Sequence, residues 1–269
     1  MTAMNDLRLT LELYRIAVRA ERQYRLNFLL MCVLGVVYQC SGIATVWVML
    51  RTFDTIAGWT FGEMAFLYAL RLLAHAAWAV PFHQLEFMDD TIREGRFDRC
   101  LVRPLNPFLQ VITTRFQMNV IGDVLAAVVM FVLAVNLVSI DFSPVHILYL
   151  ILAVIGGALA EGAAKVFVSS LSFRFVQTWA ASRLADNIYL MFGSYPTSIF
   201  GPMMSWALTW VVPVAVVAYL PAGVLLGRTG DLHIPGPVAV AAPLVGLCGF
   251  LVAYRWWHYQ VRGYQSVGA

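Results

Sequence analysis

Apolar residues gather along the chain into continuous runs of about twenty, separated by shorter polar stretches. A run of this length crosses the roughly 30 Å hydrocarbon core of a bilayer as one helix, whereas barrel strands would alternate over about ten residues. Lipid offers no hydrogen bonds to the backbone, so each run must satisfy its own amides. The pattern predicts an all-α membrane protein, a six-transmembrane-helix bundle forming a single domain over 1–269. The expected spans are 27–50, 61–82, 116–138, 146–168, 204–226 and 237–257.

The stretch between the fourth and fifth spans, 169–203, does not follow this pattern. It begins with polar residues such as Ser169 and Arg174, then becomes apolar and meets Pro196 and Pro202. A short re-entrant or interfacial helix fits this order of residues. The number of helices therefore depends on how this stretch folds.

Basic residues indicate how the predicted bundle is oriented. Lys and Arg are retained on the cytoplasmic side of a membrane. Arginines cluster before the first span and after the second, fourth and sixth, which all lie on one side, while the opposite side has only Arg51 and Arg228 in its loops. Both termini are therefore expected in the cytoplasm. The four clusters are Arg8, Arg15, Arg19, Arg22 and Arg25; Arg93, Arg96, Arg99, Arg103 and Arg115; Arg174 and Arg183; and Arg255 and Arg262.

The arm before the first span, residues 5–26, has the pattern of an amphipathic helix. On a helix its charged residues fall in one narrow stripe, and apolar residues cover much of the remainder. Such a helix lies at the membrane surface with its arginines toward anionic headgroups, or it packs on a partner protein. The stripe consists of Arg8, Glu12, Arg15, Arg19 and Arg22.

Composition and motifs exclude several classes of function. With 61% hydrophobic and 12% charged residues, the chain cannot bury its apolar surface in water. Its net charge of +3 is scattered, and no basic run with interleaved aromatics indicates nucleic-acid binding. The four cysteines form no C-x-x-C pair, and His83 with its neighbouring carboxylates lacks a second ligating element. Neither a metal site nor a catalytic serine with His and carboxylate partners is expected.

The largest polar insertion follows the second span and faces the predicted cytoplasm. Leu85, Met88 and Ile92 recur at helical spacing, Gly95 suits the end of a helix, and Pro104 forces a stop. A short amphipathic helix with both signs of charge is suited to dock in a groove on a cytoplasmic partner. A solvated loop is the alternative interpretation.

The string IREGRFDRCLVRPLNP, residues 92–107, resembles the cytoplasmic signature of a branch of the ABC type-2 transporter permeases. A glycine, an aspartate and a Leu-x-Arg-Pro-Leu element recur in that signature. Tyr195-Pro196, Val212-Pro213 and the stretch 219–227 are similar to the fifth-span region of the same branch. One departure is the connection 227–236, which is too short for a long external helical hairpin before the last span.

The resemblance implies the permease subunit of an ATP-driven exporter in the plasma (inner) membrane, with a hydrophobic or amphipathic substrate. It implies an N-terminal interfacial helix, six spans, and a coupling helix between spans two and three that engages an ABC ATPase subunit. A second permease chain is expected to complete the pore, a heterodimer being favoured over a homodimer. The residues expected to couple the permease to the ATPase are Glu86, Asp89, Arg93, Glu94, Gly95, Arg96, Asp98 and Arg103.

The chain does not carry an ATPase motif of its own. A phosphate-binding loop reads G-x-x-x-x-G-K-[ST], but the only lysine is Lys165, which follows Ala164 in an apolar span. The chain is therefore expected to be no enzyme and to hold no cofactor, with ATP and Mg bound by the separate ATPase subunits.

Ionisable residues inside the predicted spans cost roughly 2.5 to 3.5 kcal/mol each, so they are candidates for a functional site. Each contacts substrate or forms a buried polar contact that holds helices together. Glu161 and Lys165 have the i,i+4 spacing of an ion pair, and Asp123 could pair with one of the arginines. Glu63 lies on the same broad face of the second span as Arg71 and His75. Two alternatives to a transporter permease stay open. The chain could be a membrane enzyme that acts on lipid through His75, Arg71 and Glu161, or it could be a passive channel or scaffold subunit. The candidates are Arg71, His75, Asp123, Glu161 and Lys165.

Overall fold

The structure, a computed structural model, describes residues 55–266 except 115, 116, 118, 176 and 233, together with isolated positions between 12 and 48. Every regular element in this described part is a helix, as the apolar pattern predicts. Apart from the isolated positions, the expected interfacial helix 5–26 and the expected first span 27–50 lie outside the described residues.

The helix α3 (Phe61–Phe82) has the bounds that the sequence predicts for the second span. Pro81, which has no backbone N–H, lies in the last turn of α3, and the chain continues as the tighter turn η1 (His83–Phe87) and then as α4 (Met88–Arg93). Together they form one apolar helix of 33 residues. At about 1.5 Å per residue this helix is about 50 Å long, so it is too long to lie wholly inside a hydrocarbon core. Its charged residues Asp89, Asp90 and Arg93 lie at the α4 end, which makes this the end expected outside a bilayer.

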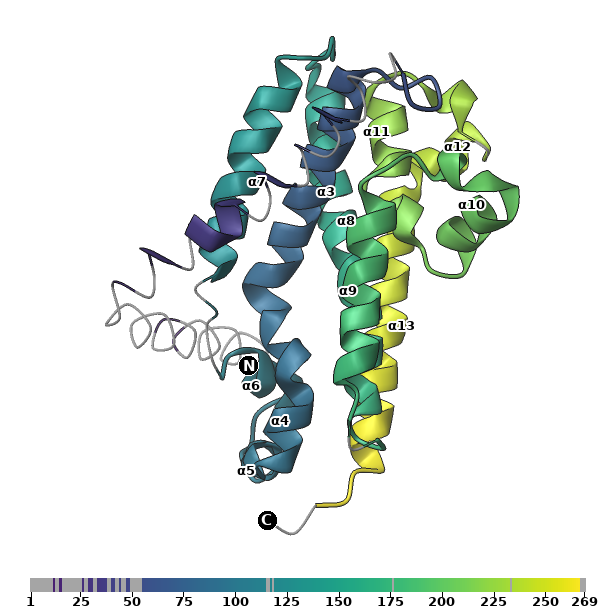
Figure 1. Cartoon of the computed structure of the whole chain (residues 1–269). Helices are drawn as coiled ribbons and strands as arrows, with labels where there is room; N and C mark the ends of the chain where they lie inside the picture. Colours follow the sequence, from purple (N-terminus) through teal and green to yellow (C-terminus); the bar gives the residue numbers. More distant parts are fainter. Residues whose placement is uncertain are drawn as a thin grey trace.

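Two further short helices lie beside α4 at the same end of the molecule, α5 (Arg96–Leu101) and α6 (Pro107–Ile112) (Figure 1). Gly95 joins α4 to α5 with a φ of +63°, a left-handed conformation that glycine adopts without strain. Leu85 of η1 and Met88 and Ile92 of α4, the apolar residues at helical spacing, are buried.

The longest apolar helices after α3 are α7 (Asn119–Val135), α8 (Pro144–Leu171) and α13 (Ala242–Arg262), the last preceded by the short α12 (Gly236–Val240). By length and composition, two helices of the described part can cross a membrane, Phe61–Arg93 and Pro144–Leu171, or three if one bent pair counts as a single span. The described residues are thus all-helical and contain two or three helices that are long and apolar enough to span a membrane, and a bundle of six spans stays a prediction.

The expected fifth span, 204–226, is wrong as a continuous helix. The chain forms α10 (Gly201–Trp210), the turn η3 (Val214–Val216) and α11 (Tyr219–Leu225), and the helical segments before and after the break are bent by 78°. Pro213 explains the break, since it donates no backbone hydrogen bond and pushes the preceding residue out of helical geometry.

The ambiguous stretch 169–203 contains a regular helix, α9 (Trp179–Gly193), followed by the turn η2 (Thr197–Phe200). In Figure 1, α9 lies along α8 and α13 and leads from the α4–α6 end toward the broken segment. The helix α9 therefore runs, beside α8 and α13, between the α4–α6 end and the broken segment.

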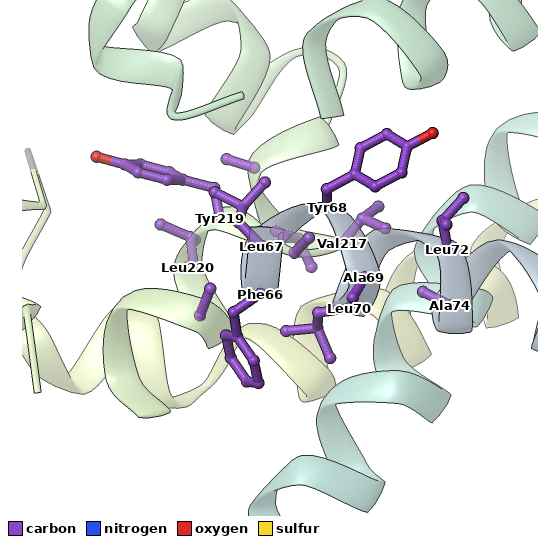
Figure 2. Close-up of a cluster of buried hydrophobic side chains, with 14 of the residues drawn as sticks. Phe66, Leu67, Tyr68, Ala69, Leu70, Leu72, Ala74, Val217, Tyr219 and Leu220 are labelled. Carbon is purple, nitrogen blue, oxygen red and sulfur yellow. The ribbon is translucent and has the colours of Figure 1, made fainter. Parts of the chain in front are cut away.

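Two clusters of buried apolar side chains hold the helices together. Figure 2 shows the first, in which Phe66, Leu67 and Leu70 of α3 meet Leu220 of α11 and Val217, which follows η3. The second fixes the α4–α6 end. There, the rings of Phe97, Phe108 and Phe173 pack edge-on against Trp257 of α13, with centroids 5.1–6.1 Å apart.

The helices α8 and α13 approach each other through glycines. A Cβ atom added to Gly246 would lie 2.0 Å from the carbonyl oxygen of Gly156, and one added to Gly156 would lie 2.3 Å from Cα of Pro243. A Cβ atom added to Gly157 would lie 2.6 Å from the carbonyl oxygen of Val217. Small residues let helix backbones approach closely in lipid. Gly162 is less restricted, because its nearest neighbours are ring atoms at 3.4 Å.

The other end of α3 is fastened by Arg228, in the connection after α11. Its Nη1 donates to the carbonyl oxygen of Gly58 and to Oε2 of Glu63, both at 2.8 Å, and its guanidinium lies over the ring of Trp59. Glu63 also accepts from the backbone N–H of Thr60 and so completes a capping box. Glu63 therefore belongs to this Arg228 clasp, and not to a site with Arg71 and His75.

Candidate functional site

Most of the sequence-predicted coupling residues lie on the tip formed by the end of α4 and by α5, residues 93–104. Arg93, Glu94, Arg99 and Arg103 are exposed there, and the apolar side chain of Val102 is 83% exposed among them. The tip is held from beneath by buried Phe97. Exposed charges of both signs can fix the orientation and the specificity of a docked partner.

The sequence-predicted coupling residues divide into two groups. Arg93, Glu94, Gly95, Arg96, Asp98 and Arg103 lie on the tip, where Nε of Arg96 contacts Oε2 of Glu94 at 2.9 Å and Asp98 accepts a hydrogen bond from Ser266. Glu86 and Asp89 lie on the opposite side and face the protein interior. The second group therefore cannot contact a docked partner directly.

Residues that follow α13 are packed against the tip. Burial and the neighbouring carboxylate of Asp98 raise the pKa of Tyr264 to about 12, so its phenol is neutral at physiological pH. The Tyr264 ring packs edge-on against Phe97 with centroids 5.2 Å apart. The residues after α13 thus help to hold α5 in place.

Asp89 is 8% exposed, and both oxygens of its carboxylate accept hydrogen bonds from within the protein. Oδ1 accepts from the hydroxyls of Ser172 and Thr178, both at 2.5 Å. Oδ2 accepts from the backbone N–H groups of Thr178 and Trp179, at 2.6 and 2.9 Å. These four hydrogen bonds join α4 to the end of α8 and to the start of α9.

Lys165 forms a second connection among the same elements. Its ammonium group, 2% exposed, lies 3.0 Å from Oε1 of Glu86 and also forms an ion pair with Asp186 of α9. The pairing of Lys165 with Glu161 expected from their spacing is wrong, because carboxylates from two other elements lie closer to the ammonium group. A buried cation between two carboxylates is stabilised only while all three groups stay in place.

Glu161 has a different partner, His75 of α3. The two side chains approach to 2.6 Å between Nδ1 and Oε1, and the Glu161 side chain is 1% exposed. Arg71 is also buried. The structure therefore brings Arg71, His75 and Glu161 to one region between α3 and α8, and it places Asp123 half-buried on α7.

A groove of about 610 Å³ opens between α8, α9 and α13, and it reaches the break between α10 and η3. Its walls are almost entirely apolar and include Ala164, Ala185, Val212 and Trp256. Tyr189 lines the groove and donates toward the carbonyl oxygen of Ala160 at 3.4 Å. The groove can therefore hold an apolar chain, and it offers few polar groups.

Sequence reasoning missed the partners of the two inward-facing acids. Ser172, Thr178 and Asp186 lie in the polar stretch after the fourth span, but nothing in that stretch identified what they bind. The signal was the position of this polar stretch, since it lies on the same predicted side of the membrane as the acidic insertion around Glu86 and Asp89.

Comparison with known proteins adds one result to this geometry. No curated protein and no solved structure matches the sequence. A family model described as ABC-2 family transporter protein matches residues 36–268, which is most of the chain. Members of this family are the membrane permeases of ABC transporters and normally work with ABC ATPase subunits. The chain belongs to the ABC-2 family of transporter proteins.

Proposed function

We propose that this permease exports a hydrophobic or amphipathic substrate across the plasma membrane, driven by separate ATPase subunits that dock on the α4–α5 tip. Both termini then face the cytoplasm together with the tip, as the distribution of arginines predicts. ATP and Mg are bound by the partner subunits, and a second permease chain completes the pore, preferably as a heterodimer.

The observation that carries this proposal is the projection of the tip beyond the membrane. A helix of 33 residues is too long for the hydrocarbon core alone, and its far end presents exposed charges around an exposed apolar side chain. Buried Phe97 anchors that surface to α13 through Trp257. A force applied to the tip therefore reaches the membrane helices.

The proposed class of substrate is supported by the groove between α8, α9 and α13. Its volume of about 610 Å³ is in the range of small-molecule sites, and its walls are apolar. Such walls suit an acyl chain or another apolar moiety.

Reversing charge on the tip is expected to separate the permease from its ATPase. In Glu94→Arg and in Arg103→Glu, the purified permease should retain about tenfold less ATPase, because charged residues at a docking surface set orientation and specificity. The measurement is the amount of ATPase that copurifies with the permease from its native membrane. The matched control for Arg103→Glu is Arg262→Glu, which makes the same charge change at an exposed position outside the tip.

Full ATPase recovery with both tip variants would contradict docking at this surface. Reproducible absence of any ATPase from the unaltered protein would instead favour a lipid-acting membrane enzyme with His75, Arg71 and Glu161 as site residues, or a passive channel.

Filling the groove is expected to slow transport without affecting ATPase docking. Ala185→Trp places an indole ring against the other groove walls, and translocation of a fluorescent phospholipid analogue in proteoliposomes should fall about tenfold. Ala180→Trp is the control, since Ala180 is exposed on the same helix and does not line the groove. Equal translocation by the two variants would show that the groove is not used.

A further inference from the structure

We propose that Asp89 is a positioning residue that transmits displacement of α4 to α9, acting as the cap of a helix to which it does not belong. The inference rests on the proposed function, because the displacement begins where an ATPase docks on the α4–α5 tip. Asp89 itself makes no contact with that partner, since its carboxylate faces the interior.

The start of α9 is incomplete without Asp89. The first N–H groups of a helix have no intrahelical acceptor, and a side chain at the first position usually supplies one. Thr178 occupies that position, but its hydroxyl caps no N–H of α9. Oδ2 of Asp89 accepts from Thr178 N and Trp179 N instead. A carboxylate there also interacts favourably with the positive end of the helix dipole.

The other carboxylate oxygen fixes the turn that precedes α9. Oδ1 accepts from Ser172 Oγ, at the end of α8, and from Thr178 Oγ1, and these two hydroxyls are also 2.7 Å apart. Hydrogen bonds to an ionised carboxylate are shorter and about twice as strong as neutral ones. All four hydrogen bonds are lost if α4 moves and the α8–α9 turn stays in place.

A second connection makes α9 follow α4 as a rigid body. Lys165 of α8 lies between Glu86, one turn before Asp89, and Asp186, two turns into α9. The helix α9 is thus attached at two points along its length. Asp89 of α4 binds its first residues directly, and Glu86 of η1 is linked to Asp186 through Lys165. Two points of attachment determine both the position and the tilt of a helix.

The far part of α9 then carries the displacement to the proposed transport path. Leu184, Ala185 and Ile188 line the groove, and α9 continues through η2 into the broken segment. A shift of α4 would therefore change the width of the groove. The residues on the exposed tip receive the partner, and Asp89 passes the movement inward.

The test compares Asp89→Asn with Asp90→Asn in the complete complex of permease and ATPase in nanodiscs. An amide has one oxygen and an NH₂ group, so it cannot accept all four hydrogen bonds. Asp90 is the matched control, because it is the next residue on α4 and pairs with Arg93 at the surface. The measurement is hydrogen exchange of peptides from α4–α5 and from α9, without nucleotide and with ATP plus vanadate.

The unaltered complex and Asp90→Asn should show nucleotide-dependent exchange in both the α4–α5 and the α9 peptides. In Asp89→Asn, the first turn of α9 should exchange about tenfold faster, and the nucleotide response should persist in α4–α5 but vanish in α9. A merely structural role would not remove the response of α9 selectively. Thr178→Val, which deletes one donor and keeps the charge, should weaken the α9 response partially and covers the case in which Asp89→Asn does not fold.

Two results overturn the inference and are distinguishable. If α9 still responds to nucleotide in Asp89→Asn and in Thr178→Val, Asp89 does not transmit the displacement, and docking at the tip stands. If neither α4–α5 nor α9 responds in the unaltered complex, docking at the tip is wrong as well.

Discussion

Replacing Lys165 with methionine is expected to lower the free energy of unfolding by about 3 to 5 kcal/mol. The ammonium group is buried between Glu86 and Asp186, and its removal leaves two carboxylates in the interior without their cation. The measurement is the free energy of unfolding in mixed detergent micelles. The same variant should weaken the attachment of α9 to η1.

The control for Lys165→Met is Arg183→Gln, which removes a cation from the same cluster. Arg183 is 53% exposed and lies 3.9 Å from Asp186, so its loss should cost at most about 1 kcal/mol. Removing all three charges, in Lys165→Met with Glu86→Gln and Asp186→Asn, should restore much of the lost stability. If the triple variant is no more stable than Lys165→Met, the cost does not come from unpaired carboxylates.

Gly246→Ala is expected to destabilise the protein by about 1 to 3 kcal/mol or more, because the new methyl group would overlap the backbone of α8. Its Cβ would lie 2.0 Å from the carbonyl oxygen of Gly156, and neither backbone can move without disturbing the contact along α8 and α13. The melting temperature in detergent reports this loss.

The matched control is Gly249→Ala, one turn further along α13. Its Cβ would lie 3.7 Å from Cβ of Ala163, an ordinary contact, so the variant should be as stable as the parent or slightly more stable. Equal melting temperatures for the two variants would contradict the close approach of these helices.

The parts of the fold that depend on local chemistry could be predicted from the sequence. The bounds of α3 agree with its apolar run, because Thr60 and Glu63 complete a capping box at its start. The helical pattern after α3 also depends on local sequence, since three apolar residues at helical spacing and one glycine define it.

The break in the expected fifth span could not be predicted in the same way. Hydropathy sums the contributions of side chains, and residues 211–217 are apolar on both sides of Pro213. The 78° bend arises from backbone geometry, to which an apolar run is insensitive. A proline at that position was the available signal.

Ion pairs between residues far apart in the sequence could not be predicted from the spacing of charges along one helix. Lys165 and Glu161 are four residues apart on one helix, yet each has a partner from another helix. An i,i+4 pair contributes only about 0.2 to 0.5 kcal/mol, so tertiary contacts decide the pairing. Likewise, nothing local relates Asp89 to Thr178, which is 89 residues away.

The Arg228 clasp holds the end of the helix Phe61–Arg93 that lies near Gly58, so a tilt caused by the proposed docking would pivot there and make the helix a lever. One end is held by hydrogen bonds and by Trp59, and the other end carries the tip on which an ATPase is proposed to dock. On a lever of about 50 Å, a tilt of about 5° moves the far end by about 4 Å and leaves the clasp almost stationary. In such a tilt the amplitude of movement would increase steadily from the Arg228 clasp to the tip, so residues of α4 would move more than those at the start of α3.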